Sequence, residues 1–232
     1  MDSAVLLAFL LLGWAGAATA AEPSSMSIRV GGDVTLPVSV PKGQSLTNLL
    51  LRASSREEAV AIWMDSKDIT VLSLPYANRV AFQEDQMCFT ITNLSLADGG
   101  YYEISTSFTS ASPTVLSRFL VAVFNITERT SVLRNDSCYL YLNCEAGLGP
   151  GQRVNYTWRD GQSGSTLSRQ PWLTQVVHSQ QKRGYTCLAQ TPTAQSTFSL
   201  VLQHLCLPST ASPGPWALGS LLLTGTLLLL LF

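Results

Sequence analysis

Five cysteines offer this chain its most specific chemistry, and four of them lie in its second half. These four are Cys138, Cys144, Cys187 and Cys206. Thiols can form disulfides or hold zinc, but no C-x-x-C pair of the kind common in zinc sites occurs here. The spacing therefore favours two disulfides, for which four cysteines allow three pairings. Because disulfides persist only in oxidising compartments, this chemistry fits an exported protein.

Residues suited to catalysis are scarce. The two histidines, His178 and His204, accompany no serine or cysteine nucleophile with an orienting carboxylate. Adjacent carboxylates such as Glu57 and Glu58 would diverge on a strand. No glycine-rich loop opening a helix and no metal-ligand spacing is found. We therefore expect no enzyme activity, cofactor, metal or small-molecule substrate.

The elements that position these residues lie between two apolar ends. The chain has 232 residues, of which 46% are hydrophobic, and a formal net charge of -1. This balance excludes a collagen, a disordered chain and a multi-span membrane protein, and it argues against a nucleic-acid partner. Residues 1–20 are predicted to be a signal peptide, with an apolar core and an A-x-A site at 18–20. A buried first helix is the weaker alternative, because Pro23 follows closely.

The second apolar end, residues 216–232, carries no charge and sits at the lower limit for a helical span of the bilayer. Small residues just upstream complete the layout of a GPI-attachment signal. We expect attachment at Ser209, with Ala211 and Ser212 as rivals, and removal of 210–232. The alternative is a single-pass anchor without a cytoplasmic tail.

The cysteine-rich half carries the signature of an immunoglobulin-like sandwich. Its residues are Cys144, Trp158, Tyr185 and Cys187. We expect the two cysteines of this series to bridge the sheets, with Trp158 packed on the bridge and the Tyr185 hydroxyl bonded to backbone. A second bridge between Cys138 and Cys206 would then clamp the base. Residues 125–209 are thus predicted to form a constant-type domain.

Residues 21–124 show the pattern of a variable-type domain. Trp63 is expected on strand C, and Tyr102 in the D-x-G-x-Y corner that enters strand F. Arg79 is placed to pair with Asp98. The predicted fold class is therefore all-β, with two tandem immunoglobulin-like β-sandwiches.

This first domain lacks the inter-sheet disulfide. Val38 and Ile104 occupy the positions where its cysteines would fall, so we expect apolar packing there. Cys88 should alternate outward from its strand. It is expected to be a free thiol, and an intermolecular disulfide is the alternative.

The chain resembles the SLAM (signalling lymphocytic activation molecule) family of the immunoglobulin superfamily. A first domain without its disulfide, a second domain with two, and the runs 137–144 and 154–158 carry the resemblance. Residues 65–75 are only thinly matched. The GPI-type tail makes the chain most similar to the GPI-anchored ligand type within that family.

The resemblance implies a cell-surface immune adhesion ligand that binds a SLAM-family receptor on an opposing cell and modulates lymphocyte or natural-killer-cell activation. The alternative is a virus-encoded or shed decoy that blocks the same receptor. In that family the front sheet of the distal domain meets the partner. Alternation, with Trp63 and Tyr102 inward, turns five residues of strands C and F outward: Ile62, Met64, Tyr101, Glu103 and Ser105. Lys67 and Asp68, near strand C′, and Arg118, near strand G, complete the expected partner-binding residues.

Charge and glycosylation refine this expectation. Residues 22–124 hold 7 basic and 10 acidic residues, a balance of -3, and 125–209 hold 7 and 4, a balance of +3. An acidic distal domain favours a basic counter-surface. Four sequons predict N-glycans away from the front sheet, with the second of them in the interdomain linker. The predicted sites are Asn93, Asn125, Asn135 and Asn155.

Overall fold

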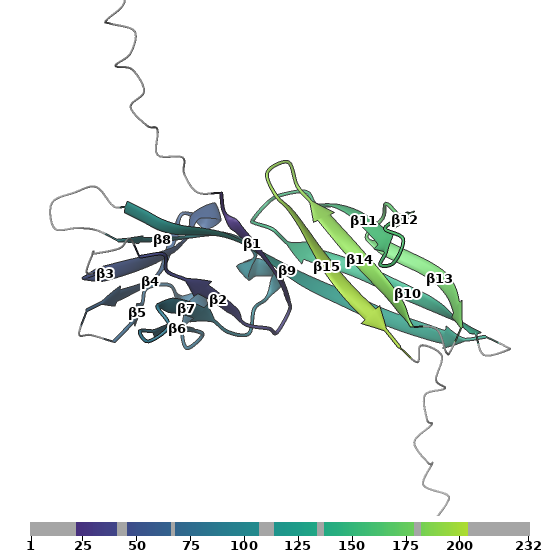
Figure 1. Cartoon of the computed structure of the whole chain (residues 1–232), viewed down its shortest axis with the longest axis horizontal. Coiled ribbons are helices and arrows are strands. Elements are labelled where there is room, and N and C mark those ends of the chain that lie inside the picture. Colours follow the sequence, from purple (N-terminus) through teal and green to yellow (C-terminus); the bar gives the residue numbers. More distant parts are fainter. Residues whose placement is uncertain are drawn as a thin grey trace, which may run out of the picture.

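The computed structural model places two β-sandwiches end to end (Figure 1), which confirms the predicted all-β class with tandem immunoglobulin-like domains. It describes residues 22–40, 46–65, 68–106, 114–133, 137–178 and 182–203. The strands of the distal domain are β1 (Ser24–Arg29), β2 (Val34–Pro37), β3 (Asn48–Ala53), β4 (Glu58–Met64), β5 (Thr70–Val71), β6 (Val80–Gln83), β7 (Cys88–Ile91) and β8 (Gly100–Thr106). Strand β9 (Thr114–Val132) runs through both domains. The remaining strands are β10 (Ser137–Gly147), β11 (Asn155–Asp160), β12 (Thr166–Ser168), β13 (Trp172–His178), β14 (Arg183–Gln190) and β15 (Gln195–Leu202).

The distal domain packs a five-stranded front sheet on a three-stranded back sheet. The front order is β9-β8-β3-β4-β5 and the back order is β2-β7-β6, while β1 pairs in parallel with β9. Alternate residues of β2 and β3 are buried, as strands covered on one side require. Three short 3-10 helices connect strands: η1 (Ser54–Arg56), η2 (Leu74–Tyr76) and η3 (Leu96–Asp98).

The strand that carries Trp63 is not the one beside β8. Strand β3 pairs with β8, and β4, which holds Trp63, lies one strand farther out. The expected assignment of Trp63 to strand C is therefore wrong. Its indole is still buried, 4.9 Å from the Phe82 ring, and its Nε1 donates to Glu84 at 2.9 Å. Leu51 of β3 is the core residue in register with Ile104 of β8.

Apolar packing fills the place of the missing disulfide. Val38 and Ile104 are both buried in the same core cluster. Cys88 is also buried, and its Sγ lies 3.5 Å from Gln83 Oε1, so the prediction that it faces outward is wrong. A thiol enclosed in this way is poorly placed for the intermolecular disulfide considered from the sequence.

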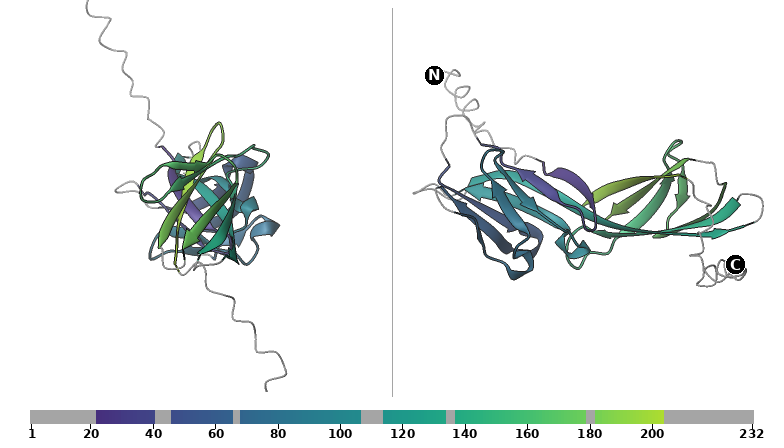
Figure 2. Two further views of the ribbon diagram at one scale, coloured as in Figure 1. Left: turned by 90° about the vertical axis from the view of Figure 1, so that its right-hand side faces the viewer. Right: turned by 90° about the horizontal axis from the view of Figure 1, so that it is seen from below.

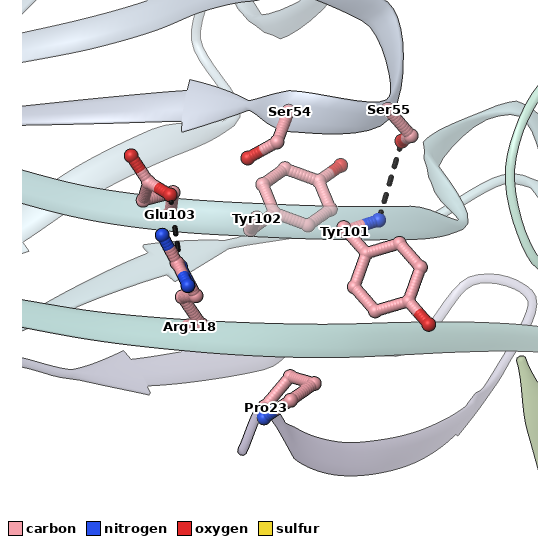
Figure 3. Close-up of a pocket in the computed structure, with 7 residues that line it drawn as sticks. All are labelled: Pro23, Ser54, Ser55, Tyr101, Tyr102, Glu103 and Arg118. Atoms are coloured by element: carbon pink, nitrogen blue, oxygen red, sulfur yellow. Dashed lines mark hydrogen bonds and ion pairs between the residues drawn. The ribbon is translucent and has the colours of Figure 1, made fainter. Parts of the chain in front are cut away.

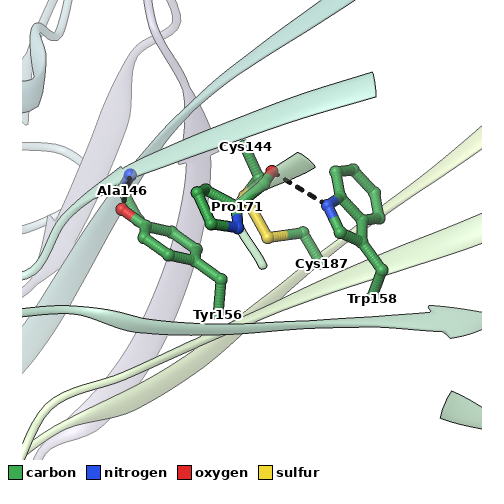
Figure 4. The surroundings of a disulfide bond; sticks show 6 residues. All are labelled: Cys144, Ala146, Tyr156, Trp158, Pro171 and Cys187. Carbon is green, nitrogen blue, oxygen red and sulfur yellow. Dashed lines mark hydrogen bonds between the residues drawn. A yellow bond between two sulfur atoms is a disulfide. The ribbon is translucent and has the colours of Figure 1, made fainter. Parts of the chain in front are cut away.

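The proximal domain packs β9-β10-β13 on β12-β11-β14-β15. A disulfide joins Cys144 on β10 to Cys187 on β14, with Cα atoms 6.6 Å apart (Figure 4). Trp158 is fully buried in register with Cys187, and its Nε1 donates to the carbonyl of Pro171. The Tyr185 hydroxyl donates to the Gln175 side chain at 3.3 Å, so the predicted bond to backbone is wrong.

The two cores share strand β9, whose alternate residues face different domains. Val121 and Val123 belong to the distal core, whereas Ala122 and Phe124 belong to the proximal core. Because both faces of the strand are covered, no free linker separates the domains (Figure 2). The expectation that Asn125 lies in a linker is therefore wrong, since it sits within this continuous strand.

Several expectations concern residues outside the described part of the chain. They are the signal peptide, Lys67, Asn135, Cys206, Ser209 and the tail at 210–232. Cys138, the predicted partner of Cys206, is buried and disulfide-bonded. Within the described ranges, no helix has the length and apolarity to cross a bilayer.

Candidate functional site

The outward side of β9-β8-β3-β4-β5, termed the front face, carries a row of residues in register. The row is Thr70, Ile62, Leu50, Ser105 and Val115. Their strand neighbours Leu49, Leu51 and Trp63 point into the core, so alternation turns Leu50 and Ile62 outward. Beyond the row, Met64 is 42% exposed at the end of β4. The face therefore offers apolar contact area across several strands.

A charged row lies beside the apolar one. Arg52, Glu103 and Arg118 are in register on β3, β8 and β9. Arg118 Nε donates to Glu103 Oε2 at 3.1 Å, with both side chains partly exposed. Within the described residues, Arg52 forms no ion pair and is exposed. This row thus presents one free guanidinium and one solvated ion pair to an approaching surface.

An open pocket of about 360 Å³ lies at the foot of the front face (Figure 3). Its lining residues are Pro23, Ser54, Ser55, Tyr101, Tyr102, Glu103 and Arg118. Ser55 Oγ accepts a hydrogen bond from the backbone of Tyr101 at 3.2 Å and fixes η1 against β8. Figure 3 shows the ion pair at one side of the pocket and the Tyr101 ring at the other. The pocket combines aromatic walls with a charged edge.

A buried network supports this end of β8. The Tyr102 hydroxyl donates to the Asp98 carbonyl at 2.6 Å, and it lies 2.9 Å from the Tyr76 hydroxyl. Arg79 binds the Asp98 carboxylate through both terminal nitrogens, at 3.1 and 2.8 Å, so the predicted pair forms. Burial tends to raise the pKa of Asp98, but hydrogen bonds from Arg79 and Ser95 outweigh it and lower the pKa. Burial raises the pKa of Tyr102, which keeps its hydroxyl protonated as a donor.

Some of the residues expected to bind a partner do lie on the front face. Ile62, Met64, Glu103 and Arg118 are there with at least partial exposure. Asp68 is exposed in the connection from β4 to β5.

Two of the expected residues are less available than predicted. Ser105 points outward by register but is only 5% exposed, so its predicted exposure is wrong. Tyr101 is half-buried against the proximal core, and its hydroxyl donates to the Thr193 carbonyl at 2.7 Å. It therefore joins the domains as well as lining the pocket.

Sequence reasoning missed three residues of this face: Leu50, Arg52 and Val115. The first two lie on β3, a strand that was not identified. Its leucine run hides the alternation, because Leu50 is apolar although it faces outward. An outward arginine two residues later is the one signal in the sequence that could have revealed the pattern.

The described sequon residues lie away from the front face. Asn93 and Asn155 are exposed, in the connection after β7 and at the start of β11. Asn125 is half-buried, and its Nδ2 donates to Glu145 Oε2 at 3.1 Å. Among the described residues, no group of His, Cys, Asp and Glu could hold a metal ion.

Comparisons with known proteins identify relatives over most of the chain. No protein-family model matches. The human T-lymphocyte surface antigen Ly-9 is 25% identical over 225 residues, covering 90% of this chain and 33% of Ly-9. Mouse SLAM family member 5 is 23% identical over 194 residues, covering 80% of this chain and 56% of that protein. The chain thus spans only a third to just over half of these relatives' lengths.

Among solved structures, a chain in the crystal structure of CD84, a protein of the SLAM family, is similar. It is 18% identical, with a TM-score of 0.38, and covers 44% of this chain and 97% of that one. The relatives are immune cell-surface proteins of the immunoglobulin superfamily and are not enzymes. This agrees with the prediction that the chain is not an enzyme.

Proposed function

Because the chain is a homologue of SLAM-family members of the immunoglobulin superfamily, we propose that it is a cell-surface immune ligand that binds a SLAM-family receptor in trans. Binding uses the front face of the distal domain and modulates the activation of the lymphocyte or natural killer cell that bears the receptor. No small molecule, metal or nucleic acid takes part.

The observation that carries this proposal is the pair of adjacent rows on the front face. Leu50, Ile62 and Met64 supply apolar area, and the row beside them supplies charges of both signs. Interfaces owe much of their binding energy to a desolvated centre, while flanking charges steer and select the partner. Single apolar residues are common on a solvated sheet face, but here Leu50 and Ile62 are in register on neighbouring strands and form a contiguous patch. The charged row itself holds two arginines and one glutamate, whereas the distal domain as a whole has a balance of -3, and this long-range field favours the approach of a partner with a basic face.

The pocket at the foot of this face adds a specific contact. An extended side chain from the receptor could insert beside the Tyr101 ring and reach the Glu103 carboxylate or the Arg118 guanidinium. Such an insertion fixes the register of two docked sheets, because one side chain must find one cavity.

We further propose a GPI lipid as the membrane anchor, with Ser209 as the attachment residue. Small residues at 209–212 followed by an apolar stretch at 216–232 support this anchor. A phosphatidylinositol-specific phospholipase should release the protein from intact cells. Retention on the surface after treatment would favour the single-pass alternative.

Binding of the full chain, displayed on cells, to a panel of soluble SLAM-family ectodomains tests the proposed function. We expect one or more of them to bind, and receptor-bearing reporter cells to be activated on contact. Failure of every ectodomain to bind would contradict the proposal. Binding without activation, together with inhibition of the natural ligand, would identify the decoy instead.

A further inference from the structure

A cluster of exposed aromatic residues lies on the proximal domain, away from the front face. We define the aromatic face as the outward side of β10 and β13 formed by Tyr139, Tyr141, Trp172 and Val176. Their exposures are 48%, 37%, 49% and 53%. Tyr139 pairs in register with Val176. Trp172 pairs with Asn143, which is the next residue after Tyr141 on the same face of β10, so the four side chains form one continuous surface. A contiguous exposed apolar surface indicates a site of interaction with another molecule or group.

The sequon asparagine Asn125, on β9, faces the same side of the β9-β10-β13 sheet as the aromatic face. Its neighbours in the strand, Phe124 and Ile126, point into the proximal core, so alternation turns Asn125 outward with the aromatic face. The hydrogen bond from its Nδ2 to Glu145 holds the side chain there, because Glu145 is its exposed register partner on β10. The amide nitrogen that would carry a sugar therefore starts at the edge of this face.

The separation is short enough for an N-glycan to cross. Thr127 is two residues beyond Asn125, and it is in register with Asn143 and, through it, with Trp172. Two residues along a strand and two strand spacings place the Asn125 and Trp172 Cα atoms about 12 Å apart. The core of an N-glycan contains several sugar rings and covers such a distance.

We propose that the N-glycan on Asn125 lies across the aromatic face and covers Trp172 and Tyr141. Pyranose rings present faces of C–H bonds, whose slight positive charge suits the negative face of an aromatic ring. A glycan rooted on this surface also obstructs docking by a second copy or by a receptor. The aromatic face then binds the protein's own carbohydrate, and the front face remains accessible to a protein partner.

Tryptophan fluorescence can test this in the full chain purified from glycosylating cells. The described tryptophans other than Trp172 are buried, with Trp63 7% and Trp158 0% exposed. The Trp172→Phe variant supplies the background of all other tryptophans. Subtracting it leaves the Trp172 signal, whose quenching by acrylamide reports how open the indole is to solvent.

Thr127→Ala removes the sequon, and Thr127→Ser keeps it while changing the same exposed side chain. We expect the Trp172 quenching constant to rise about two-fold or more in Thr127→Ala and to stay unchanged in Thr127→Ser. Enzymatic deglycosylation of the folded wild-type protein should produce the same rise, which covers the case of a poorly folding variant. Asn155→Gln, on the other sheet, should leave the quenching unchanged.

Two results would overturn the proposal. One is mass spectrometry that finds Asn125 without a glycan. The other is a Trp172 that is quenched equally with and without that glycan, which would leave the aromatic face open to a protein partner. Receptor binding through the front face does not enter either readout, so the two proposals fail independently.

Discussion

The hydroxyl of Tyr101 in the distal domain donates a hydrogen bond to the carbonyl of Thr193 in the proximal domain, at 2.7 Å. Its ring packs against the proximal core and also lines the front-face pocket. One side chain therefore connects the candidate binding surface with the domain that supports it.

Replacing Tyr101 with Phe should loosen this connection while keeping the ring. The loss of one hydrogen bond should lower the free energy of unfolding by about 1 kcal/mol. Urea denaturation measures this, and small-angle scattering should show a wider spread of interdomain angles. Tyr139→Phe, at an exposed position, is the control and should alter neither. Equal behaviour of the two variants would contradict the role of Tyr101.

Glycine at position 147 is required for the close approach of the domains. A Cβ there would lie 1.9 Å from the carbonyl oxygen of Leu96 in η3, a backbone atom that cannot step aside. Gly147→Ala should therefore destabilise the protein by about 2 kcal/mol or push the domains apart. Gly184→Ala is the matched control, since its nearest neighbour would lie at 3.5 Å. Thermal unfolding that is identical for both variants would count against this packing.

Breaking the Arg79–Asp98 ion pair should destabilise the distal domain far more than breaking the pair on the front face. Its side chains are 20% and 4% exposed, against 41% and 24% for Arg118 and Glu103. Arg79→Ala leaves a buried carboxylate without its partner and should cost about 3 kcal/mol. Arg118→Ala should cost less than about 1 kcal/mol. Urea denaturation of both variants gives the comparison, and similar losses would refute it.

The lowered pKa of Asp98 predicts how stability depends on pH. A carboxylate whose pKa is lower in the folded state stabilises that state above its ordinary value of 3.8, and the effect is lost as pH falls through the folded pKa. The stability difference between wild type and Asp98→Asn should therefore stay constant from pH 7 to about pH 5 and shrink in stronger acid. Denaturation at a series of pH values tests this. A difference that grows toward low pH would contradict it.

Much of the fold could be predicted from residues whose local chemistry leaves few choices. The Cys144, Trp158 and Cys187 series specifies strands that must meet across one core, and the structure brings the three together. The D-x-G-x-Y corner likewise predicts η3 and the start of β8, where Tyr102 bonds back to Asp98.

The strand order of the front face could not be predicted in the same way. A tryptophan at position 63 matches the usual strand C residue, but Trp63 lies on β4, where it pairs with Leu49 of β3. The strand beside β8 is β3. Outward apolar residues such as Leu50 and Ile62 erase the alternation that would reveal a strand. These are also the residues proposed to bind a partner, so the apolar side chains proposed for binding remove the alternation of apolar and polar residues from which the strand could be predicted.

The claim that the front face binds a SLAM-family receptor is tested most directly by one comparison of affinities. Met64→Lys places a charge among the apolar residues of that face, and Val201→Lys makes the same change at a 57% exposed position on β15. With both variants folded, receptor affinity should fall about ten-fold or more for Met64→Lys and stay at the wild-type value for Val201→Lys. Wild-type affinity in Met64→Lys, or an equal loss in both variants, would contradict binding through the front face.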